Sequence, residues 1–535
     1  MFDTPGVYVR EIPSGVRSIS GVATSNGAVI GPARRGPVGQ AVRLTSFGEF
    51  ERRFGGLYAP SEATYAVRNF FLNGGAVLFF VRVADSAAAA ATVNTLGPNA
   101  DDLAVTASSE GTWGDNLRVG ISRAPDADSP TTFNMLVREY QGPNVLREEA
   151  FIDLSITEGD PRYVETVVDE ESEMITAAHV TATLPDPSDL DGAGTPARTL
   201  DDLLEAPVTA FTPLAGGDDG AVPGTTGWPA AMQTLIVGSE ANTTGIFALN
   251  GIVPEVFNIM MIPDAAGLNR TDATERAAMV AVYQQAYTYC RQNFAFLIID
   301  PPDDVDRSNI TDWRDQLGAA AGPNSAMYYP RVEGADPLNP LRLRMMRPSG
   351  IAGGTYSRTD TTRGVWKAPA GTEARIAGGT PVDVMTNRQQ GPLNTQGINA
   401  IRTFPVYNSV IWGARTLDGA DARASEWRYI NVRRLALFIE NSLNQGLQWV
   451  VFEPNDEPLW ANVRLNVGAF MSQLHRQGAF QGASARDAYL VKCDSETTTQ
   501  ADINLGILNL YVGFAPVRPA EFVVLRIQQR FQTAN

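Results

Sequence analysis

The chain of 535 residues carries a formal net charge of −17 at pH 7, and 44% of its residues are hydrophobic. This charge disfavours non-specific binding to nucleic acid or to an anionic membrane, and the length predicts about three domains. No run approaches the ~18 apolar residues of a membrane span, and Met1 is not followed by a signal peptide pattern. Cys290 and Cys493 lie far apart, which fits free buried thiols and a protein made in a cytoplasm.

Residues 1–20 predict a short strand that turn residues separate from the body of the protein. The run VYVREI, from Val7 to Ile12, lies between Pro5-Gly6 and Pro13. Apolar β-formers bounded by proline are typical of a strand. Such a strand could be an ordinary edge of an internal sheet, or an arm that pairs outside its own subunit. The pattern alone leaves both interpretations open.

Residues 21–85 predict a compact α/β unit, with a buried strand at 28–31 and a central strand at 76–83. Ser46 and Glu49 form a capping-box signature for a short helix, and a second helix is expected to start near Ser61. From 86 to about 235 the composition changes to short strands broken by turn residues, with many acidic residues in the second half. We expect an inserted, β-rich outer domain with a strongly solvated surface.

The α/β pattern returns in residues 236–515. A strand at 256–262, a helix capped by Asp272 and a strand at 294–299 form a predicted βαβ unit with parallel pairing. The Gly-, Pro- and Thr-rich residues 334–400 are expected to be irregular. Further predicted elements are strands at 326–329, 410–413, 449–452, 489–493 and 507–514, and helices at 431–447 and from about 455.

The C-terminal residues 516–535 repeat the N-terminal pattern, because EFVVLRIQQRF follows Pro516 and Pro519. The fold class expected for the whole chain is therefore α/β (mixed α+β) and multidomain, with an inserted β-rich domain and β-arms at both ends. The candidate arm strands contain Val7, Val9, Ile12, Phe522, Val524, Leu525 and Ile527.

A search for catalytic chemistry finds little. With only His179 and His475 present, a His-dependent triad or His-rich metal site is nearly excluded. There is no P-loop motif, and the calcium-like run that starts at Asp189 has Arg198 where a bidentate glutamate is needed. A Cys493–His475 pair is conceivable, but a buried structural cysteine fits better. We expect no catalytic residue, cofactor or metal, and the missing chemistry points to assembly.

Several motifs together resemble contractile tail sheath proteins of phages and phage-derived injection systems. They are MFDTPGVYVREIPSG at the start, GVWKAPAGTEARI (364–376), GPLNTQGINAIRTFP (391–405), VIWGARTL (410–417), EWRYINVRRLALFIENSL (426–443), WVVFEPNDEPLWANVR (449–464) and PAEFVVLRIQQ (519–529). The inserted region matches only in GTWGDNLRV. The order of the motifs is that of the family, and the C-terminal half matches almost throughout.

The resemblance implies a hollow helical sleeve of stacked subunits around an inner tube, linked by arms that complete a small sheet in neighbouring subunits. Contraction would release a metastable extended packing. The implied partners are other copies of the chain, the inner tube protein, and baseplate and tail-terminator proteins, in a virion tail or injection particle assembled in the bacterial cytoplasm. Arg433 and Arg434, at the start of a helix, are candidates to face the tube, and an ordinary solvated helix start is equally compatible.

Two other classes remain open on the sequence alone. One is an α/β enzyme with an unusual site in residues 334–400, and the other is a surface-binding module that works through its acidic domain. The sheath hypothesis differs from both because it requires the purified chain to form tubes or sleeves.

Overall fold

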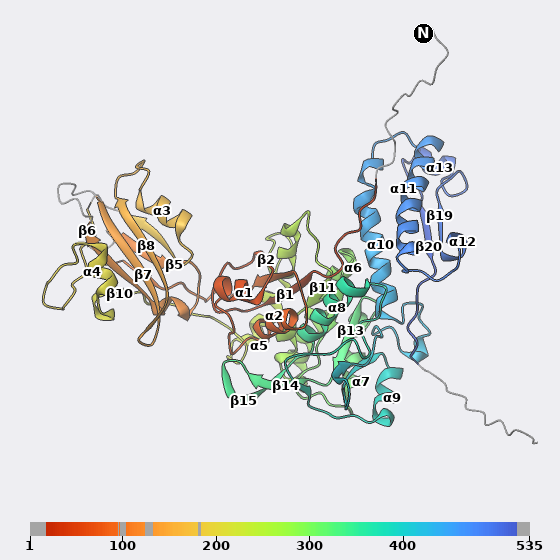
Figure 1. Ribbon diagram of the computed structural model, residues 1–535, viewed down its shortest axis with the longest axis horizontal. Helices are drawn as coiled ribbons and strands as arrows, with labels where there is room; N and C mark the ends of the chain where they lie inside the picture. The colour runs from red at the N-terminus through yellow and green to blue at the C-terminus, as the bar shows by residue number, and fades with distance from the viewer. Residues whose placement is uncertain (1–17, 95, 97–102, 124–131, 180–182, 522–535) are drawn as a thin grey trace, which may run out of the picture.

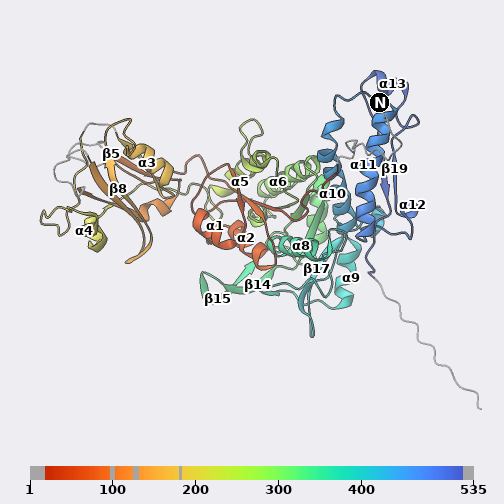
Figure 2. The same cartoon turned by 45° about the horizontal axis from the view of Figure 1, so that its top comes forward.

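The structure is a computed structural model of the chain, and it describes residues 18–94, 96, 103–123, 132–179 and 183–521. The described chain is elongated: an α/β core lies in the middle, a β-rich insert (residues 89–218) lies at one end, and the helices α10 and α11 with the strands β19 and β20 lie at the other end (Figure 1). The turned view shows the same three parts in the same order (Figure 2). The predicted mixed α+β class is confirmed.

The core is built on an eight-stranded sheet with the order β18-β17-β13-β12-β11-β1-β3-β2. Its inner pairings are parallel, whereas the edge strands β2 and β18 pair antiparallel to β3 and β17. Most of its strands are buried on both faces, as expected for a parallel sheet covered by helices. The strands are β1 (Gly27–Gly31), β2 (Ala41–Leu44), β3 (Leu78–Arg82), β11 (Ile259–Met261), β12 (Phe296–Ile299), β13 (Ser325–Tyr329), β17 (Ile398–Phe404) and β18 (Asn408–Ile411).

Two hydrophobic clusters cover the two faces of this sheet. On one face α5 (Trp228–Val237), α6 (Ala273–Gln292) and α7 (Ile310–Gln316) supply the cluster, and on the other α1 (Phe47–Phe54), α2 (Glu62–Leu72) and α8 (Ser349–Arg363) supply it. The predicted βαβ unit is confirmed, because α6 connects the parallel strands β11 and β12. The side chain of Asp272 caps α6 by accepting from the backbone N–H groups of Thr274 and Glu275.

The expectation of an irregular segment at 334–400 is wrong. This region contains β14 (Val332–Asp336), β15 (Asn339–Met346), α8, β16 (Thr380–Pro381) and α9 (Asn387–Thr395). The glycines of helix α8 give its sequence the composition of a loop. In the structure they allow α8 to pack closely on α2. A Cβ on Gly350 would lie 2.5 Å from the carbonyl oxygen of Ala66, and one on Gly354 would lie 2.3 Å from that of Phe70. Glycine therefore lowers helix propensity here but is required by the contact.

The insert is β-rich. It contains the sheets β10-β6-β7-β8 and β4-β5-β9, which enclose a hydrophobic cluster of their own. Its elements are β4 (Thr92–Val93), β5 (Leu103–Ala107), β6 (Leu117–Arg123), β7 (Thr132–Gln141), β8 (Asn144–Ser155), α3 (Val164–Glu171), β9 (Ile175–His179), α4 (Leu200–Glu205) and β10 (Thr212–Pro213). The acidic residues at 169–171 are exposed. The core resumes before residue 236, because Trp228 and Met232 of α5 already pack in the core cluster.

The C-terminal lobe comprises α11 (Glu457–Arg476), α12 (Ala485–Ala488), β19 (Tyr489–Lys492), α13 (Gln500–Asn504) and β20 (Tyr511–Phe514), and it packs on α10 (Ile430–Gly446). The predicted strand at 449–452 is wrong. A short 3₁₀ turn, η7 (Gln448–Val450), stands there, and Phe452 is fully exposed. The run lies between two packed helices and finds no neighbouring strand among the described residues. The other 3₁₀ turns are η1 (Thr112–Asn116), η2 (Val208–Ala210), η3 (Gly245–Ile252), η4 (Pro263–Gly267), η5 (Gly318–Ala320) and η6 (Asp421–Arg423).

Candidate functional site

The sheet of the C-terminal lobe has two short antiparallel strands, β19 and β20, paired from Tyr489 with Phe514 to Lys492 with Tyr511. In the part of the chain that the structure describes, no third strand pairs with either one. Leu490 and Tyr511 are each 60% exposed. An isolated two-stranded sheet is marginally stable, and unpaired strand edges are templates for further strands. The lobe thus presents an incomplete sheet.

Helix α11 packs against this sheet and supports it. Asp456 caps the helix by accepting from the backbone N–H of Leu459, and Pro458 occupies its first turn. Its buried face, with Val463 and Val467, packs in one hydrophobic cluster with the half-buried residues of both strands. The helix predicted from about residue 455 is confirmed, and its buried face gives the sheet a rigid base.

The chain enters the described region alongside α10, next to the C-terminal lobe. Ile19 is buried in the cluster of the lobe and lies against Gly446 of α10. The backbone N–H of Val22 donates to the hydroxyl of Ser442 (3.2 Å), and Arg434 donates to the carbonyl oxygen of Thr24 (2.8 Å). We call residues 18–24 the N-terminal root.

Arg434 has a structural role that the sequence analysis did not foresee. Its guanidinium forms two hydrogen bonds to the carboxylate of Asp360 (3.0 and 2.6 Å) and lies 4.8 Å from the ring centroid of Tyr356. The side chains of Arg434 and Asp360 are only 4% and 1% exposed. Burial raises the pKa of Asp360, while the charge of Arg434 acts in the opposite direction. The predicted tube-facing position does not fit Arg434, because its charge is buried and paired with Asp360 inside the subunit.

Arg433 is less enclosed, with 15% of its side chain exposed. It donates to the side-chain oxygen of Asn324 (2.8 Å) and lies 4.8 Å from the ring centroid of Trp427. Glu440, at 3.4 Å, is a partly exposed ion-pair partner. A contact of Arg433 with the tube stays a prediction.

The chain leaves the described region through residues 517–521, which we call the C-terminal root. Arg415, with 1% of its side chain exposed, donates to both carboxylate oxygens of Glu521 (2.8 and 2.6 Å) and to Asp421 (2.9 Å). Asn431 donates to the carbonyl oxygen of Val517 (3.0 Å). The root borders a cleft of about 720 Å³ lined by aromatic and polar side chains. Both roots are thus fixed to the core by a buried arginine.

The candidate arm residues lie outside the described residues, so their predicted strands stay predictions. They are Val7, Val9, Ile12, Phe522, Val524, Leu525 and Ile527. The structure describes only the roots from which the two terminal segments continue.

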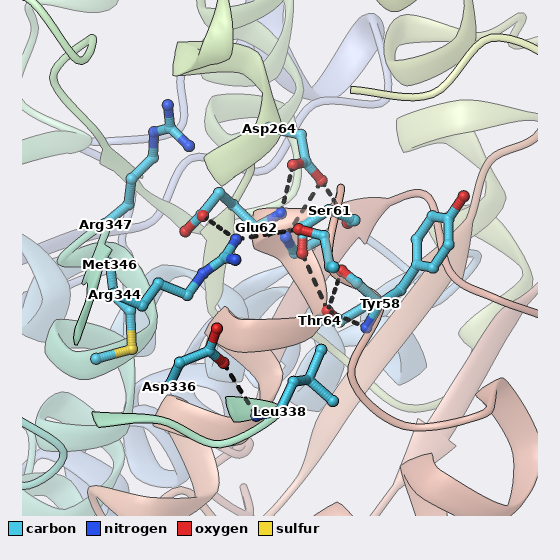
Figure 3. Close-up of polar contacts among 12 residues, drawn as sticks. Tyr58, Ser61, Glu62, Thr64, Asp264, Asp336, Leu338, Arg344, Met346 and Arg347 are labelled. Carbon is cyan, nitrogen blue, oxygen red and sulfur yellow. Dashed lines mark hydrogen bonds and ion pairs between the residues drawn. The ribbon is translucent and has the colours of Figure 1, made fainter. Parts of the chain in front are cut away.

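The core sheet has the place where α/β proteins commonly bind ligands, but an internal carboxylate fills it. The chain runs from β1 to β3 on one side and from β11 to β13 on the other, so the strand order reverses between β1 and β11. There Asp264 accepts from the hydroxyl of Ser61 (2.8 Å) and from the backbone N–H groups of Glu62 (2.7 Å) and Ala63 (3.2 Å) (Figure 3). The N-terminus of α2, a typical anion site, is therefore occupied by the protein itself.

An ionic network surrounds this carboxylate. Glu62 pairs with Arg344 (2.6 Å), whose guanidinium lies 3.8 Å from the ring centroid of Tyr65. Arg347 pairs with Asp303 (2.7 Å) and lies near the buried Asp300. Burial raises the pKa of Asp264 to about 6 and that of Asp300 to about 7. The contacts of Asp264 and Arg344 tie the start of α2 to η4 and to β15 (Figure 3).

The other chemical candidates in the sequence also have structural roles. The carboxylates of Asp189 and Asp191 accept backbone N–H groups within their own exposed turn. Cys493 is fully buried, and burial raises the pKa of its thiol. His475 lies 3.0 Å from the carbonyl oxygen of Gly482. Among the described residues, no group of three or more His, Cys, Asp or Glu is placed to hold a metal. No helix in the described ranges is long and apolar enough to cross a membrane.

Residues 423–530, which include the incomplete sheet, match the family of the phage tail sheath C-terminal domain. The chain is also similar to two tail sheath proteins. The tail sheath protein of Vibrio phage KVP40 is 25% identical over 244 residues, and a putative prophage major tail sheath protein of Pseudomonas aeruginosa strain UCBPP-PA14 is 25% identical over 239 residues. These alignments cover 43% and 44% of this chain, and 35% and 58% of the relatives.

Solved structures extend the similarity along the whole chain. The sheath of the extracellular contractile injection system PVC in its contracted state matches with a TM-score of 0.56 at 20% identity, covering 99% of this chain and 98% of that one. The sheath tail protein of Listeria innocua matches with a TM-score of 0.59 at 11% identity, covering 94% and 96%. The chain has the tail sheath fold. The resemblance that its sequence motifs indicated is confirmed, and the incomplete sheet lies within the sheath domain that the family match defines.

Proposed function

We propose that the chain is the structural subunit of a contractile sheath that polymerises by exchanging terminal strands between copies. The observation that carries the proposal is the two-stranded sheet β19–β20, whose outer edges have no partner among the described residues. Terminal strands of neighbouring copies would extend it through backbone hydrogen bonds and apolar side chains. Such a contact is heterologous and need not close, so it generates a helical polymer.

The two roots would transmit force from the arms to the core of the subunit. If the arms connect neighbouring subunits, force along them enters the core where Arg434 donates to the carbonyl oxygen of Thr24 and where Arg415 pairs with Glu521. A subunit held in this way can rotate and slide as a rigid body while its arms keep the lattice connected. Contraction would then convert a metastable extended packing into a wider one of lower free energy, with no nucleotide consumed in the subunit.

The partners follow from this role. We infer other copies of the chain, a baseplate, an inner tube protein and a tail terminator, in a phage tail or injection particle assembled in the bacterial cytoplasm. A baseplate is supported by the similarity to a chain in the baseplate of the anti-feeding prophage, at 23% identity and a TM-score of 0.53. A non-enzymatic role is supported by the occupied position at Asp264. No specific observation favours an enzyme or a surface-binding module.

Two truncations test the proposal. The purified full-length chain should form tubes or sleeves in negative-stain micrographs. Deleting residues 1–14, or residues 522–535 so that Glu521 and its pair with Arg415 remain, should leave a folded monomer that no longer polymerises. A full-length chain that stays at one to four copies at high concentration would contradict the sheath role. Global unfolding of either truncation would show that the terminal strand belongs to the subunit's own core.

A further inference from the structure

The cleft of about 720 Å³ beside the C-terminal root is formed by segments that are far apart in the sequence. Residues 366–371 after α8, helix α9, residues 412–414 after β18 and the root itself all line it. Its volume lies within the roughly 300–1,000 Å³ of pockets that bind ligands in proteins. The cleft is therefore large enough to hold several side chains of an occupant.

The walls of the cleft combine aromatic rings with amide side chains. The rings of Phe404 and Trp412 lie 4.6 Å apart between their centroids, and Trp412 is 36% exposed. Among the amides, Asn431 donates to the carbonyl oxygen of Val517 (3.0 Å), so it already binds the backbone of the root. Aromatic rings can contact apolar side chains, and amides can pair with backbone groups. Such walls suit an extended apolar peptide.

The described chain ends at the rim of this cleft. Val517 and Glu521 line it, and Arg415 fixes the end of the root by donating to both carboxylate oxygens of Glu521 (2.8 and 2.6 Å). The next residues in the sequence, 522–525, are the apolar run FVVL. Because one residue spans at most about 3.6 Å, these four residues stay within about 15 Å of Glu521. An apolar segment of the same chain is thus within reach of the cleft.

The covalent connection favours this segment over the same segment of a second copy. A peptide joined through a short linker to its own binding site has an effective concentration on the order of millimolar. A second copy competes equally only when the protein itself reaches such a concentration. In a dilute, unassembled subunit, the cleft is therefore expected to bind residues 522–525 of its own chain.

We propose that residues 522–525 bind in the cleft of their own subunit before assembly. This inference rests on the proposed strand exchange, because it gives the C-terminal segment a second site that competes with β19 and β20 of a neighbouring copy. The segment must leave the cleft before it pairs with those strands. The cleft therefore lowers the fraction of subunits that are ready to polymerise.

Gly391 allows the cleft to be blocked without strain in the backbone. Asn387, Gln390, Gly391 and Asn394 of α9 all line the cleft, so this face of the helix is turned towards it. A Cβ on Gly391 would meet no atom within 4 Å. G391W should therefore place its ring in the cleft. G391A is the matched control, because it makes the same change in the backbone without adding a ring.

The first test measures trypsin cleavage after Arg526 at protein concentrations below those that give polymers. A bound segment is cleaved only when it leaves its site, so the rate reports the free fraction. G391W should be cleaved at least about tenfold faster than G391A and the unmodified chain. W412A, which removes a wall of the cleft instead of filling it, should also be cleaved faster, and it serves if G391W does not fold.

Two results of this test would overturn the proposal. Equal cleavage rates after Arg526 in G391W, W412A, G391A and the unmodified chain would show that the cleft does not bind the segment. Protection that increases with the concentration of the unmodified chain, while it is still monomeric at the start of the titration, would assign the cleft to a segment of a second copy.

The second test separates this inference from the proposed function. G391W should lower the protein concentration needed for polymerisation by at least about threefold relative to G391A, because its C-terminal segment is free to pair. A higher threshold for G391W would overturn the competition between the two sites. If no form of the chain polymerises at any concentration, the sheath function fails, and the cleavage rates still decide whether the cleft binds residues 522–525.

Discussion

The insert and the C-terminal lobe, at opposite ends of the molecule, differ in how complete their β-structure is. In the insert, strands of up to 12 residues form a four-stranded and a three-stranded sheet around a buried cluster with Trp113 and Phe151. In the C-terminal lobe, two strands of four residues each form the sheet, and none of the residues in these strands is fully buried. The insert has enough strands to complete its own sheets. In the C-terminal lobe, α11 supports a sheet that has only two strands among the described residues.

The junctions with the core differ in the same way. The insert joins the core through polar contacts, which include the ion pair of Arg35 with Glu139 (2.8 Å) and the hydrogen bond from the backbone N–H of Gly36 to the hydroxyl of Ser109 (2.9 Å). Helix α10 joins the C-terminal lobe to the core because it contributes apolar side chains to the cluster of each, and because Arg434 forms a buried ion pair with Asp360. This comparison indicates that a junction whose charged groups have alternative partners is less sensitive to the loss of one partner than a junction that depends on one ion pair.

The largest expected effect comes from breaking the two buried ion pairs in turn. R434A leaves Asp360 buried with its main charge partner removed, and should lower the free energy of unfolding by about 3–5 kcal/mol. R35A should cost less, about 2 kcal/mol, because Glu139 retains Arg147 at 2.8 Å and Arg34 at 3.9 Å. Urea denaturation of both variants, followed by circular dichroism, measures the difference. Equal losses would mean that Arg147 and Arg34 do not replace the lost partner.

A change in the core provides a reference that belongs to neither lobe. Burial raises the pKa of Asp300 to about 7, from its ordinary value of 3.8. The folded state therefore holds this proton more tightly than the unfolded state, so the side chain costs nothing below about pH 4, and its cost grows as the pH rises to about 7. In D300N the amide oxygen can still accept from the N–H of Ser349, and the amide nitrogen replaces a carboxylate oxygen that has no hydrogen-bond partner.

We expect D300N to match the unmodified chain near pH 4 and to be more stable at pH 8 by at least about 1 kcal/mol, since one pKa unit corresponds to about 1.4 kcal/mol. Unfolding free energies measured from pH 4 to 8 check the slope. A constant difference across this range would show that the ionisation of Asp300 is not linked to folding.

The smallest effect on stability separates the two lobes most directly. Leu490 on β19 and Ile152 on β8 are 60% and 52% exposed. L490E and I152E should each change the free energy of unfolding of the monomer by no more than about 0.5 kcal/mol. Only L490E should reduce polymerisation, because its carboxylate would stand where an added strand must pack. Sedimentation of polymers measures this; equal reduction by I152E would indicate general charge repulsion.

The sequence predicted many elements correctly where local signals were strong. Asp272 starts α6, the apolar stripe from Leu459 to Leu474 marks α11, and the βαβ unit around β11 and β12 follows from buried strands. It failed where packing opposed propensity. Helix α8 needs Gly350 and Gly354 for close contact, so its composition imitates a loop, and the residues from Trp449 to Phe452 look like a strand but lie between two helices.

By itself, the sequence determined the mixed α+β class, the family resemblance and the missing catalytic motifs, because these depend on periodicity, on the order of motifs and on residue types. Only the tertiary structure decided that Arg434 is buried against Asp360, that Asp264 occupies the position where a ligand would bind, and that β19 and β20 form an unfinished sheet. These three features join residues that are far apart in the chain, and no local pattern encodes which distant partner a charge or a strand edge finds.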